Sequence, residues 1–252
     1  MARGGDNKRY MKIHQVEQQS PEWFALRDLK LTSSKATAIG NWDKGKGGLD
    51  TLARGLVRKH FSSNKEEGFE TKDTKRGNEC EPIARELYEL ESGNKVTMVG
   101  FIEADEYSGC STDGLIGEDG VLEIKSPDDP AYFDVLLEME VPSDYMWQAQ
   151  MELLITGRKW CDLVFYSGNY DKGLITFRIL PDLQKQEALK KGIETGKRLI
   201  KEYIAKYEER RKETAPRIIG GEPEEELVLV YENNKRTGTI SIPKGPAPKK
   251  KK

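Results

Sequence analysis

Three residues near the middle of the chain have the types and the spacing to bind a metal ion and activate water. Glu123 follows Asp113 after nine intervening residues, and Lys125 stands two residues further on. Carboxylate oxygens are the ligands that hard divalent cations prefer, and the backbone carbonyl of Ile124 can supply another oxygen. A lysine beside such an ion can orient a water molecule and favour its ionised form. The set therefore predicts metal-dependent hydrolysis of a phosphodiester.

These side chains can act together only if a hairpin places them on one face. Side chains alternate along a strand, so residues 123 and 125 share a face. A loop of two residues, 118–119, would put Asp113 opposite Ile124 and on the wrong face. A loop of three residues, Glu118-Asp119-Gly120, would put Asp113 opposite Lys125 and beside Glu123. We expect that loop with Gly120 at positive φ, because the favoured three-residue hairpin ends in a left-handed residue. A β-bulge elsewhere could give the same registry.

The pattern Asp-x(9)-Glu-x-Lys is typical of PD-(D/E)xK nucleases, although a surface hairpin with ordinary charges also produces it. Segments on both sides make the resemblance more specific. Taken in order, four segments resemble the successive motifs of lambda exonuclease and the YqaJ-type viral recombinase nucleases. The resemblance covers roughly residues 15–210, and the segments are Gly77, Glu81, Ala84 and Arg85; Ser111-x-Asp113-Gly114-Leu115; Leu122-Glu123-x-Lys125-x-Pro127; and Tyr145-Met146-x-Gln148-x-Gln150.

The resemblance implies a role for each matching residue. Asp113, Glu123 and the carbonyl of Ile124 would hold Mg²⁺, or Mn²⁺, and Lys125 would be the catalytic lysine. Glu81 would assist the metal site from a helix, and Gln148 would lie beside the active site. Two alternatives stay open: a glutamate at a helix start can simply complement the helix dipole, and Gln148 could be a buried amide with satisfied hydrogen bonds.

A second group of residues resembles the pocket that holds the 5′ phosphate of the substrate in this family. The group comprises Arg27, Ser34 and Ser111. Arginine offers a planar fork that matches the oxygens of a phosphate, and serine hydroxyls can donate to it. Arg27 could also be an ordinary surface cation on an amphipathic helix.

The resemblance implies a 5′→3′ exonuclease that acts on double-stranded DNA ends and leaves 3′ single-stranded overhangs for homologous recombination. It also implies a ring-shaped homotrimer and a single-strand annealing protein as partner. Alternatives are a PD-(D/E)xK endonuclease, a RecB-like nuclease of another polarity, or a DNA-end-binding protein with an inactive nuclease fold. The chain departs from related nucleases at Glu152, where a tyrosine often stands four residues after the motif glutamine.

The order of helix and strand signals predicts an α/β (α+β) fold. We expect one central mixed β-sheet flanked by helices, as in the restriction-endonuclease-like PD-(D/E)xK core. We divide the chain into a flexible arm (1–12), an exonuclease domain (13–212) and an extension with a basic, disordered end (213–252). Apolar periodicity predicts helices over 49–61, 81–91, 130–139, 144–156 and 181–212, and strands over 95–103, 160–166 and 174–180, besides a hairpin within 108–125 and a small one within 227–242.

The composition excludes several classes of site. Lysine plus arginine (41) nearly balance aspartate plus glutamate (43), so the net charge of −2 neither indicates nor excludes binding to nucleic acid. Three cysteines cannot supply the four thiolates of an iron–sulphur cluster. No apolar run approaches the roughly 20 residues of a membrane span, and the start lacks the apolar core of a signal peptide. We expect a soluble cytoplasmic protein of a bacterium or a virus-infected cell, with no membrane partner.

Overall fold

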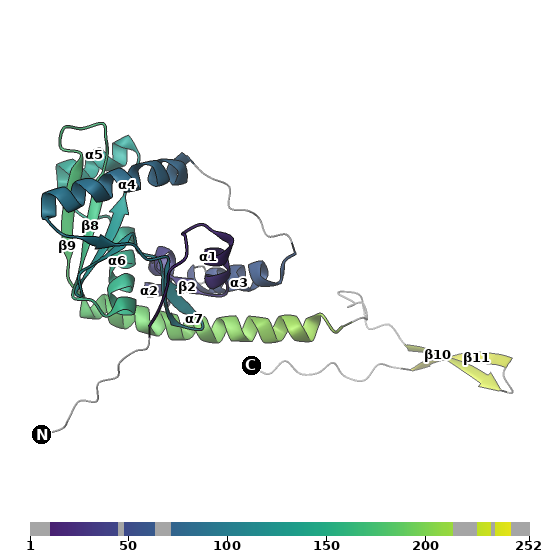
Figure 1. The fold of residues 1–252 in the computed structure, drawn as a ribbon. Helices are drawn as coiled ribbons and strands as arrows, with labels where there is room; N and C mark the ends of the chain where they lie inside the picture. The colour runs from purple at the N-terminus through teal and green to yellow at the C-terminus, as the bar shows by residue number, and fades with distance from the viewer. Residues whose placement is uncertain (1–10, 45–47, 64–71, 214–225, 233–234, 243–252) are drawn as a thin grey trace, which may run out of the picture. The chain divides into compact units, whose positions relative to one another are not determined.

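The computed structural model describes residues 11–44, 48–63, 72–213, 226–232 and 235–242. The chain divides into two compact units, Met1–Glu208 and Glu209–Lys252. The expected N-terminal arm lies almost entirely outside the described residues, and so does the basic end of the extension. The site residues expected from the sequence all lie in the first unit, whose fold is shown in Figure 1.

Two β-sheets, rather than the single one expected, form the first unit within the described residues. The strand expected over 95–103 is broken: β3 pairs with β6, whereas β4 pairs with β1 and β5. The fold class is confirmed and the number of sheets was wrong. One sheet has the order β1-β4-β5-β2 and the other β3-β6-β7-β8-β9. The strands are β1 Lys12–His14, β2 Leu31–Thr32, β3 Val96–Thr97, β4 Phe101–Asp105, β5 Ser108–Cys110, β6 Gly114–Ile116, β7 Gly120–Lys125, β8 Trp160–Tyr166 and β9 Leu174–Ile179.

The helices follow the predicted periodicity except at one boundary. The side chain of Ser20 accepts a hydrogen bond from the Trp23 amide and so caps the first helix. Helices expected over 49–61, 130–139, 144–156 and 181–212 are confirmed within a few residues. The helices are α1 Pro21–Leu26, the 3₁₀ turn η1 Ser33–Lys35, α2 Ala36–Gly40, α3 Gly48–Phe61, α4 Lys72–Ser92, α5 Asp129–Glu138, α6 Ser143–Thr156 and α7 Leu183–Arg210.

Helix α4 begins nine residues before the expected start at residue 81. Glu81 therefore lies in the middle of the helix, and Pro82 lies inside it. Proline there removes one backbone hydrogen bond, and exposure of Pro82 and Asn78 leaves the freed carbonyl near water. Because Glu81 is not in the first turn, interaction with the helix dipole no longer explains it. Gly93, at φ +70°, ends the helix.

The five-stranded sheet has different helices on its two faces (Figure 1). Leu122 and Ile124 of β7 belong to the core cluster that contains Ala84 and Tyr88 of α4. The side chains that alternate with them point to the opposite face, where α6 packs. Helix α6 also contacts β4 and β5, so it lies between the two sheets. Because side chains alternate along β7, every second residue of this strand faces α6.

The hairpin of β6 and β7 has a three-residue loop, but its position differs from the expected one. Ile116 pairs with Gly120, so the loop is Gly117-Glu118-Asp119 and the residue at positive φ is Gly117, at +50°. Gly120 is a glycine for another reason, since a Cβ there would lie 2.3 Å from the ring of Trp160. The register brings Asp113 opposite Glu123, not Lys125. Asp113 and Glu123 still share a face, as the prediction required.

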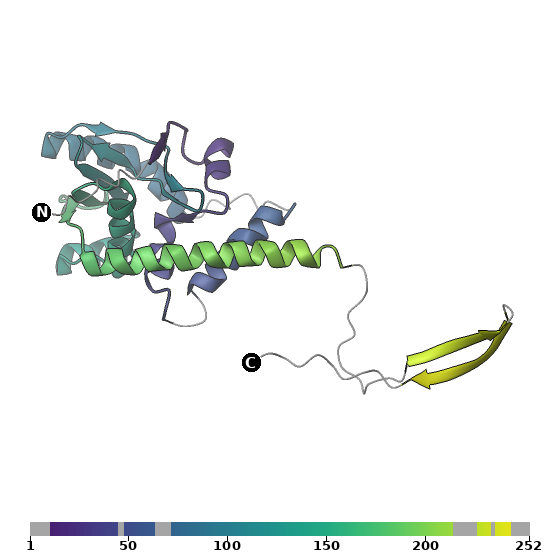
Figure 2. The same ribbon diagram turned by 90° about the horizontal axis from the view of Figure 1, so that it is seen from below.

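The long helix α7 packs along α2 and α3, as Figure 2 shows from below. Gly192 permits this approach, because a Cβ there would lie 1.9 Å from the carbonyl oxygen of Ile39. This close packing of α7 on α2 holds α2 and the preceding turn η1 against the rest of the unit. In the ranges that the structure describes, no helix has both the length and the apolar character to cross a bilayer.

The second unit contains a β-hairpin. Strands β10, Glu226–Glu232, and β11, Lys235–Ile242, pair antiparallel, with an irregularity at Val230 and Tyr231. The expected small hairpin is therefore confirmed.

Candidate active site

Glu123, Lys125 and Gln148 form a closed set of hydrogen bonds between β7 and α6. The Nζ atom of Lys125 donates to Oε1 of Glu123 at 2.7 Å and to Oε1 of Gln148 at 3.0 Å. The Nε2 atom of Gln148 donates to the same oxygen of Glu123 at 2.5 Å. The chain brings these three predicted site residues together from segments 23 residues apart.

Asp113 joins this set from the end of the neighbouring strand. Its Oδ2 accepts a hydrogen bond from the backbone N–H of Ile124 at 2.6 Å. The N–H and C=O of one strand residue point to the same edge, so the Ile124 carbonyl faces the side on which Asp113 stands. The assignment of that carbonyl as a metal ligand stays a prediction.

Glu81 extends from α4, and its carboxyl group lies close enough to Asp113 for the two to interact electrostatically. Burial and then the charge of Asp113 raise the pKa of Glu81 to about 7, which identifies the two carboxyl groups as neighbours. Its Oε1 accepts a hydrogen bond from Arg85, one helical turn later. Because Arg85 occupies one oxygen of the carboxylate, Glu81 could ligate a metal ion through its other oxygen.

Burial raises the pKa values of the carboxyl groups of the site. Burial, followed by the charge of Asp113, raises the pKa of Glu123 to about 7. Burial also raises the pKa of Asp113, although Lys125 and the Ile124 N–H oppose it. Burial alone would lower the pKa of Lys125, but the charges of Glu123 and Asp113 outweigh it and raise the pKa overall. The site therefore holds one protonated lysine beside the two buried carboxyl groups of Asp113 and Glu123.

The oxygen atoms of the site fit a hard divalent cation, and one oxygen of Glu123 supports this fit. Oε2 of Glu123 is buried and has no hydrogen-bond partner among the described residues. In the described ranges no three His, Cys, Asp or Glu side chains are already placed to ligate one ion. The three carboxylates are instead turned to Arg85, to the Ile124 N–H and to Lys125. A cation would satisfy the unpartnered oxygen and offset the repulsion that raises the pKa values.

Glu152 is a residue of this site to which the sequence analysis assigned no function. It lies one turn after Gln148 on α6 and is fully buried. Its Oε1 accepts from Nε2 of Gln148 at 3.1 Å, and its Oε2 has no partner among the described residues. Burial and then the charge of Glu123 raise the pKa of Glu152 well above its ordinary value. Its spacing of four residues from Gln148 was the available signal.

Arg27, Ser34 and Ser111 come together in a second cluster. The guanidinium of Arg27 donates to Oγ of Ser111 at 3.2 Å and to Oγ of Ser34 at 3.4 Å. It also donates to Oγ1 of Thr32 at 3.3 Å and stacks on the ring of Trp23, 4.1 Å from the centroid. Burial lowers the pKa of Arg27 to about 10, so the group stays charged at neutral pH. A cation held among hydroxyls suits an anion with several oxygens.

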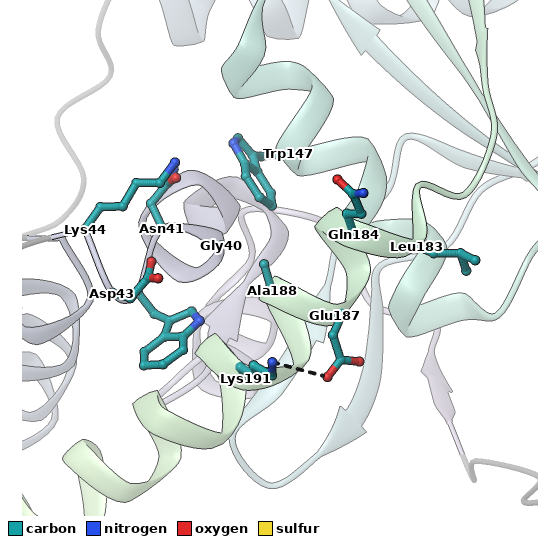
Figure 3. Close-up of a pocket in the computed structure, with 11 residues that line it drawn as sticks. Gly40, Asn41, Asp43, Lys44, Trp147, Leu183, Gln184, Glu187, Ala188 and Lys191 are labelled. Carbon is teal, nitrogen blue, oxygen red and sulfur yellow. Dashed lines mark ion pairs between the residues drawn. The ribbon is translucent and has the colours of Figure 1, made fainter.

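The two clusters adjoin. Ser111 of the arginine cluster and Asp113 stand two residues apart in the chain. A cavity of about 520 Å³ is lined by both Ser34 and Gln148. A second cavity, of about 510 Å³, shares Asn41 and Lys44 with it and extends to Trp147 and α7 (Figure 3). The two cavities therefore adjoin at Asn41 and Lys44.

The matched motifs define the family of the chain. Residues 22–159 match the model of the YqaJ-like viral recombinase domain, and the chain belongs to that family. The resemblance expected from the sequence motifs is thus confirmed.

Solved structures agree with this assignment. An alkaline exonuclease from Laribacter hongkongensis, LHK-Exo, is 26% identical over 76% of this chain and 98% of its own, with a TM-score of 0.69. The same enzyme in complex with dAMP gives 27% identity over the same shares and a TM-score of 0.70. A phage-related exonuclease from Haemophilus somnus 129PT, 17% identical over 73% of this chain and 98% of its own, shares the fold with a TM-score of 0.58. A search of curated proteins gave no match.

Proposed function

We propose that this chain is a Mg²⁺-dependent exonuclease that degrades one strand of double-stranded DNA from its 5′ end and leaves a 3′ overhang. Its family and the exonuclease named in the most similar structures discussed above support a deoxyribonuclease. The complex of that relative with dAMP supports a nucleotide as product.

The observation that carries the proposal is the short link between the arginine cluster and the carboxylates. Ser111 accepts hydrogen bonds from both Arg27 and Trp23, and Asp113 follows two residues later. A terminal 5′ phosphate bound at Arg27 would place a nearby phosphodiester beside Asp113 and Glu123. A 3′ end carries a hydroxyl and offers Arg27 no such anion. Binding of the terminal phosphate at Arg27 would therefore explain both why degradation needs a DNA end and why it runs 5′→3′.

The residues of the chain would divide the work of hydrolysis. Asp113, Glu123 and the Ile124 carbonyl would hold Mg²⁺ (or Mn²⁺), with Glu81 assisting, and the ion would supply polarisation of the scissile phosphate. Lys125 is protonated and directs two of its three N–H donors to Glu123 and Gln148, so the third can bind the attacking water and stabilise its ionised form. Gln148 holds Lys125 against Glu123 and keeps its ammonium group in place.

Linear duplexes with and without a 5′ phosphate, labelled at either end of either strand, test the proposal. We expect loss of 5′-terminal nucleotides in Mg²⁺, faster from phosphorylated ends, and none in EDTA. Cutting of closed circles would indicate an endonuclease, and binding without degradation would indicate an end-binding protein.

Replacing Arg27 tests the phosphate anchor alone. We expect Arg27→Ala to slow degradation of phosphorylated ends about 10- to 100-fold, because hydrogen bonds to charged groups contribute about 1.5–3 kcal/mol. Non-phosphorylated ends should be degraded at an almost unchanged rate. Arg54→Ala is the matched control, since Arg54 pairs with Asp50 on α3 and lies outside the cluster. Equal loss on both kinds of end would contradict the anchor.

The family resemblance leads us to propose also a homotrimer and a single-strand annealing protein as partner. A ring around the duplex would make degradation processive. Light scattering should give three times the mass of one chain. A monomer that nevertheless degrades thousands of nucleotides per encounter would contradict the ring.

A further inference from the structure

Glu152 is a buried carboxyl group for which the proposed function has no use. Its side chain has an exposed fraction of 0%, and one of its two oxygens has no partner among the described residues. A buried carboxyl oxygen without a hydrogen bond costs the fold stability. A residue that costs stability is retained most simply because it contributes to function.

The surroundings of Glu152 do not compensate for this cost. Burial, and then the charge of nearby Glu152, raise the pKa of the thiols of Cys110 and Cys161. Lys125 is the nearby cation, but its described hydrogen bonds go to Glu123 and Gln148. An apolar side chain of similar length would therefore suit this position better than a carboxyl group, as far as the fold is concerned.

The contact of Glu152 with Gln148 completes the hydrogen bonds of one carboxamide. Gln148 has two N–H donors, one directed to Glu123 and the other to Glu152, while its carbonyl oxygen accepts from Lys125. Three hydrogen bonds fix the plane of the amide, whereas loss of the one to Glu152 would leave one N–H without its acceptor and hold that plane less firmly. A reversed amide would place its oxygen against two carboxyl groups and release Lys125.

We propose that Glu152 is a positioning residue that locks the Gln148 carboxamide so that its carbonyl oxygen holds Lys125 against Glu123, at the expense of fold stability. This inference rests on the proposed nuclease function. A purely structural acid would stabilise the fold, an acid that acts through its charge could not be replaced by an amide, and a metal ligand would change the affinity for Mg²⁺. These roles make different predictions.

Three variants separate the roles. Glu152→Met should raise the melting temperature of the metal-free protein by about 2–4 °C and lower kcat about tenfold with KM unchanged. Glu152→Gln keeps an oxygen that can accept from Gln148, so its kcat should stay within about twofold of wild type. Gln150→Met is the matched control on the same helix, because Gln150 bonds only to Leu180 and Asp182 among the described residues. It should lower the melting temperature and leave kcat unchanged.

A double substitution tests whether Glu152 acts through Gln148. Glu152→Met should reduce kcat no further in a Gln148→Ala background, because the amide that it positions is absent. The inference is wrong if Glu152→Met lowers the melting temperature and keeps kcat, if Glu152→Gln is as slow as Glu152→Met, or if calorimetric Mg²⁺ binding is lost in Glu152→Gln. A wild-type chain that does not degrade DNA would instead defeat the proposed function, before any variant is compared.

Discussion

Two buried acids on neighbouring strands of one sheet have opposite hydrogen-bonding states. Asp162 of β8 lies beside Leu122 of β7, one residue from Glu123. Asp162 is 1% exposed, and both its oxygens are bonded: Tyr88 donates at 2.6 Å, and Arg178 donates to each oxygen at 2.9 Å. Glu123 is 3% exposed and has one oxygen without a partner among the described residues.

The difference follows the two faces of the sheet. Asp162 points toward α4, where the phenol of Tyr88 completes a structural cluster with Asn94 and Arg178. Glu123 points toward α6, where carboxyl groups outnumber the described partners that could neutralise them. A buried acid whose oxygens all accept hydrogen bonds stabilises the packing of the elements that it joins. A buried acid with an unbonded oxygen can still bind a ligand there. Substitutions on the two faces should therefore change different properties.

The largest effect is expected on the α6 face. Asp113→Asn should lower cleavage at least about 10³-fold, because a metal ligand contributes several kcal/mol to the transition state. The melting temperature of the metal-free protein should not fall, since the substitution removes a repelling charge. Nuclease assays and thermal denaturation measure the two properties. Asp119→Asn, which alters an exposed pair with Lys159, is the control. Near-normal cleavage by Asp113→Asn would contradict the assignment of the acids on the α6 face to catalysis.

The opposite pattern is expected on the α4 face. Asp162→Asn should lower the free energy of unfolding by about 2 kcal/mol, because a buried phenol and a bidentate arginine lose a charged acceptor. The half-exposed position of Arg178 keeps the loss below that of a fully buried pair. Cleavage by the folded protein should be unchanged. Urea denaturation measures the loss, and a stable but inactive variant would place Asp162 in the site instead.

The pH dependence of the metal-free protein sharpens the contrast further. Glu81 and Glu123 have pKa values raised from 4.5 to about 7, so between these values the folded chain binds more protons than the unfolded chain. Their contribution to stability is therefore present at low pH and is lost as pH rises through about 7, on the order of a few kcal/mol. Denaturation at pH 5 and pH 8 measures it. Glu123→Gln should flatten the slope, and an unchanged slope would contradict the assignment.

The smallest effect concerns the partner of Asp162. Arg178→Lys should cost about 0.5–1 kcal/mol, because lysine loses the bidentate geometry and the stacking on Trp160, yet keeps a charge at an exposed position. Denaturant titration beside Asp162→Asn compares the two. A loss as large as that of Asp162→Asn would mean that Arg178, rather than the acid, supports this cluster.

Part of this result could be predicted without coordinates, because it depends on local periods. Asp113 and Glu123 share a face once a loop of odd length is assumed, since side chains alternate along strands. The limits of α3, α5, α6 and α7 followed within a few residues from apolar spacing. The motifs that match the family lie within such elements, and their order along the chain does not depend on how the elements pack.

Other features were wrong or missed because they depend on contacts distant in sequence. Gly120 pairs with Ile116 and packs against the ring of Trp160, and the loop residue at positive φ is Gly117. The start of α4 was misplaced because Glu-Pro at 81–82 reads as the beginning of a helix. Ser111 joins Arg27 from 84 residues away, and it reaches this cluster beside β2 because β2 pairs with β5.

By itself, the sequence determined which groups are available and which of them share a strand or a helix face, because alternation and helical periodicity are properties of neighbouring residues. Only the tertiary structure decided how well each buried acid is bonded. Asp162 meets Tyr88 and Arg178, while Glu123 and Glu152 meet too few donors, because those partners come from elements whose approach is set by packing across the sheet.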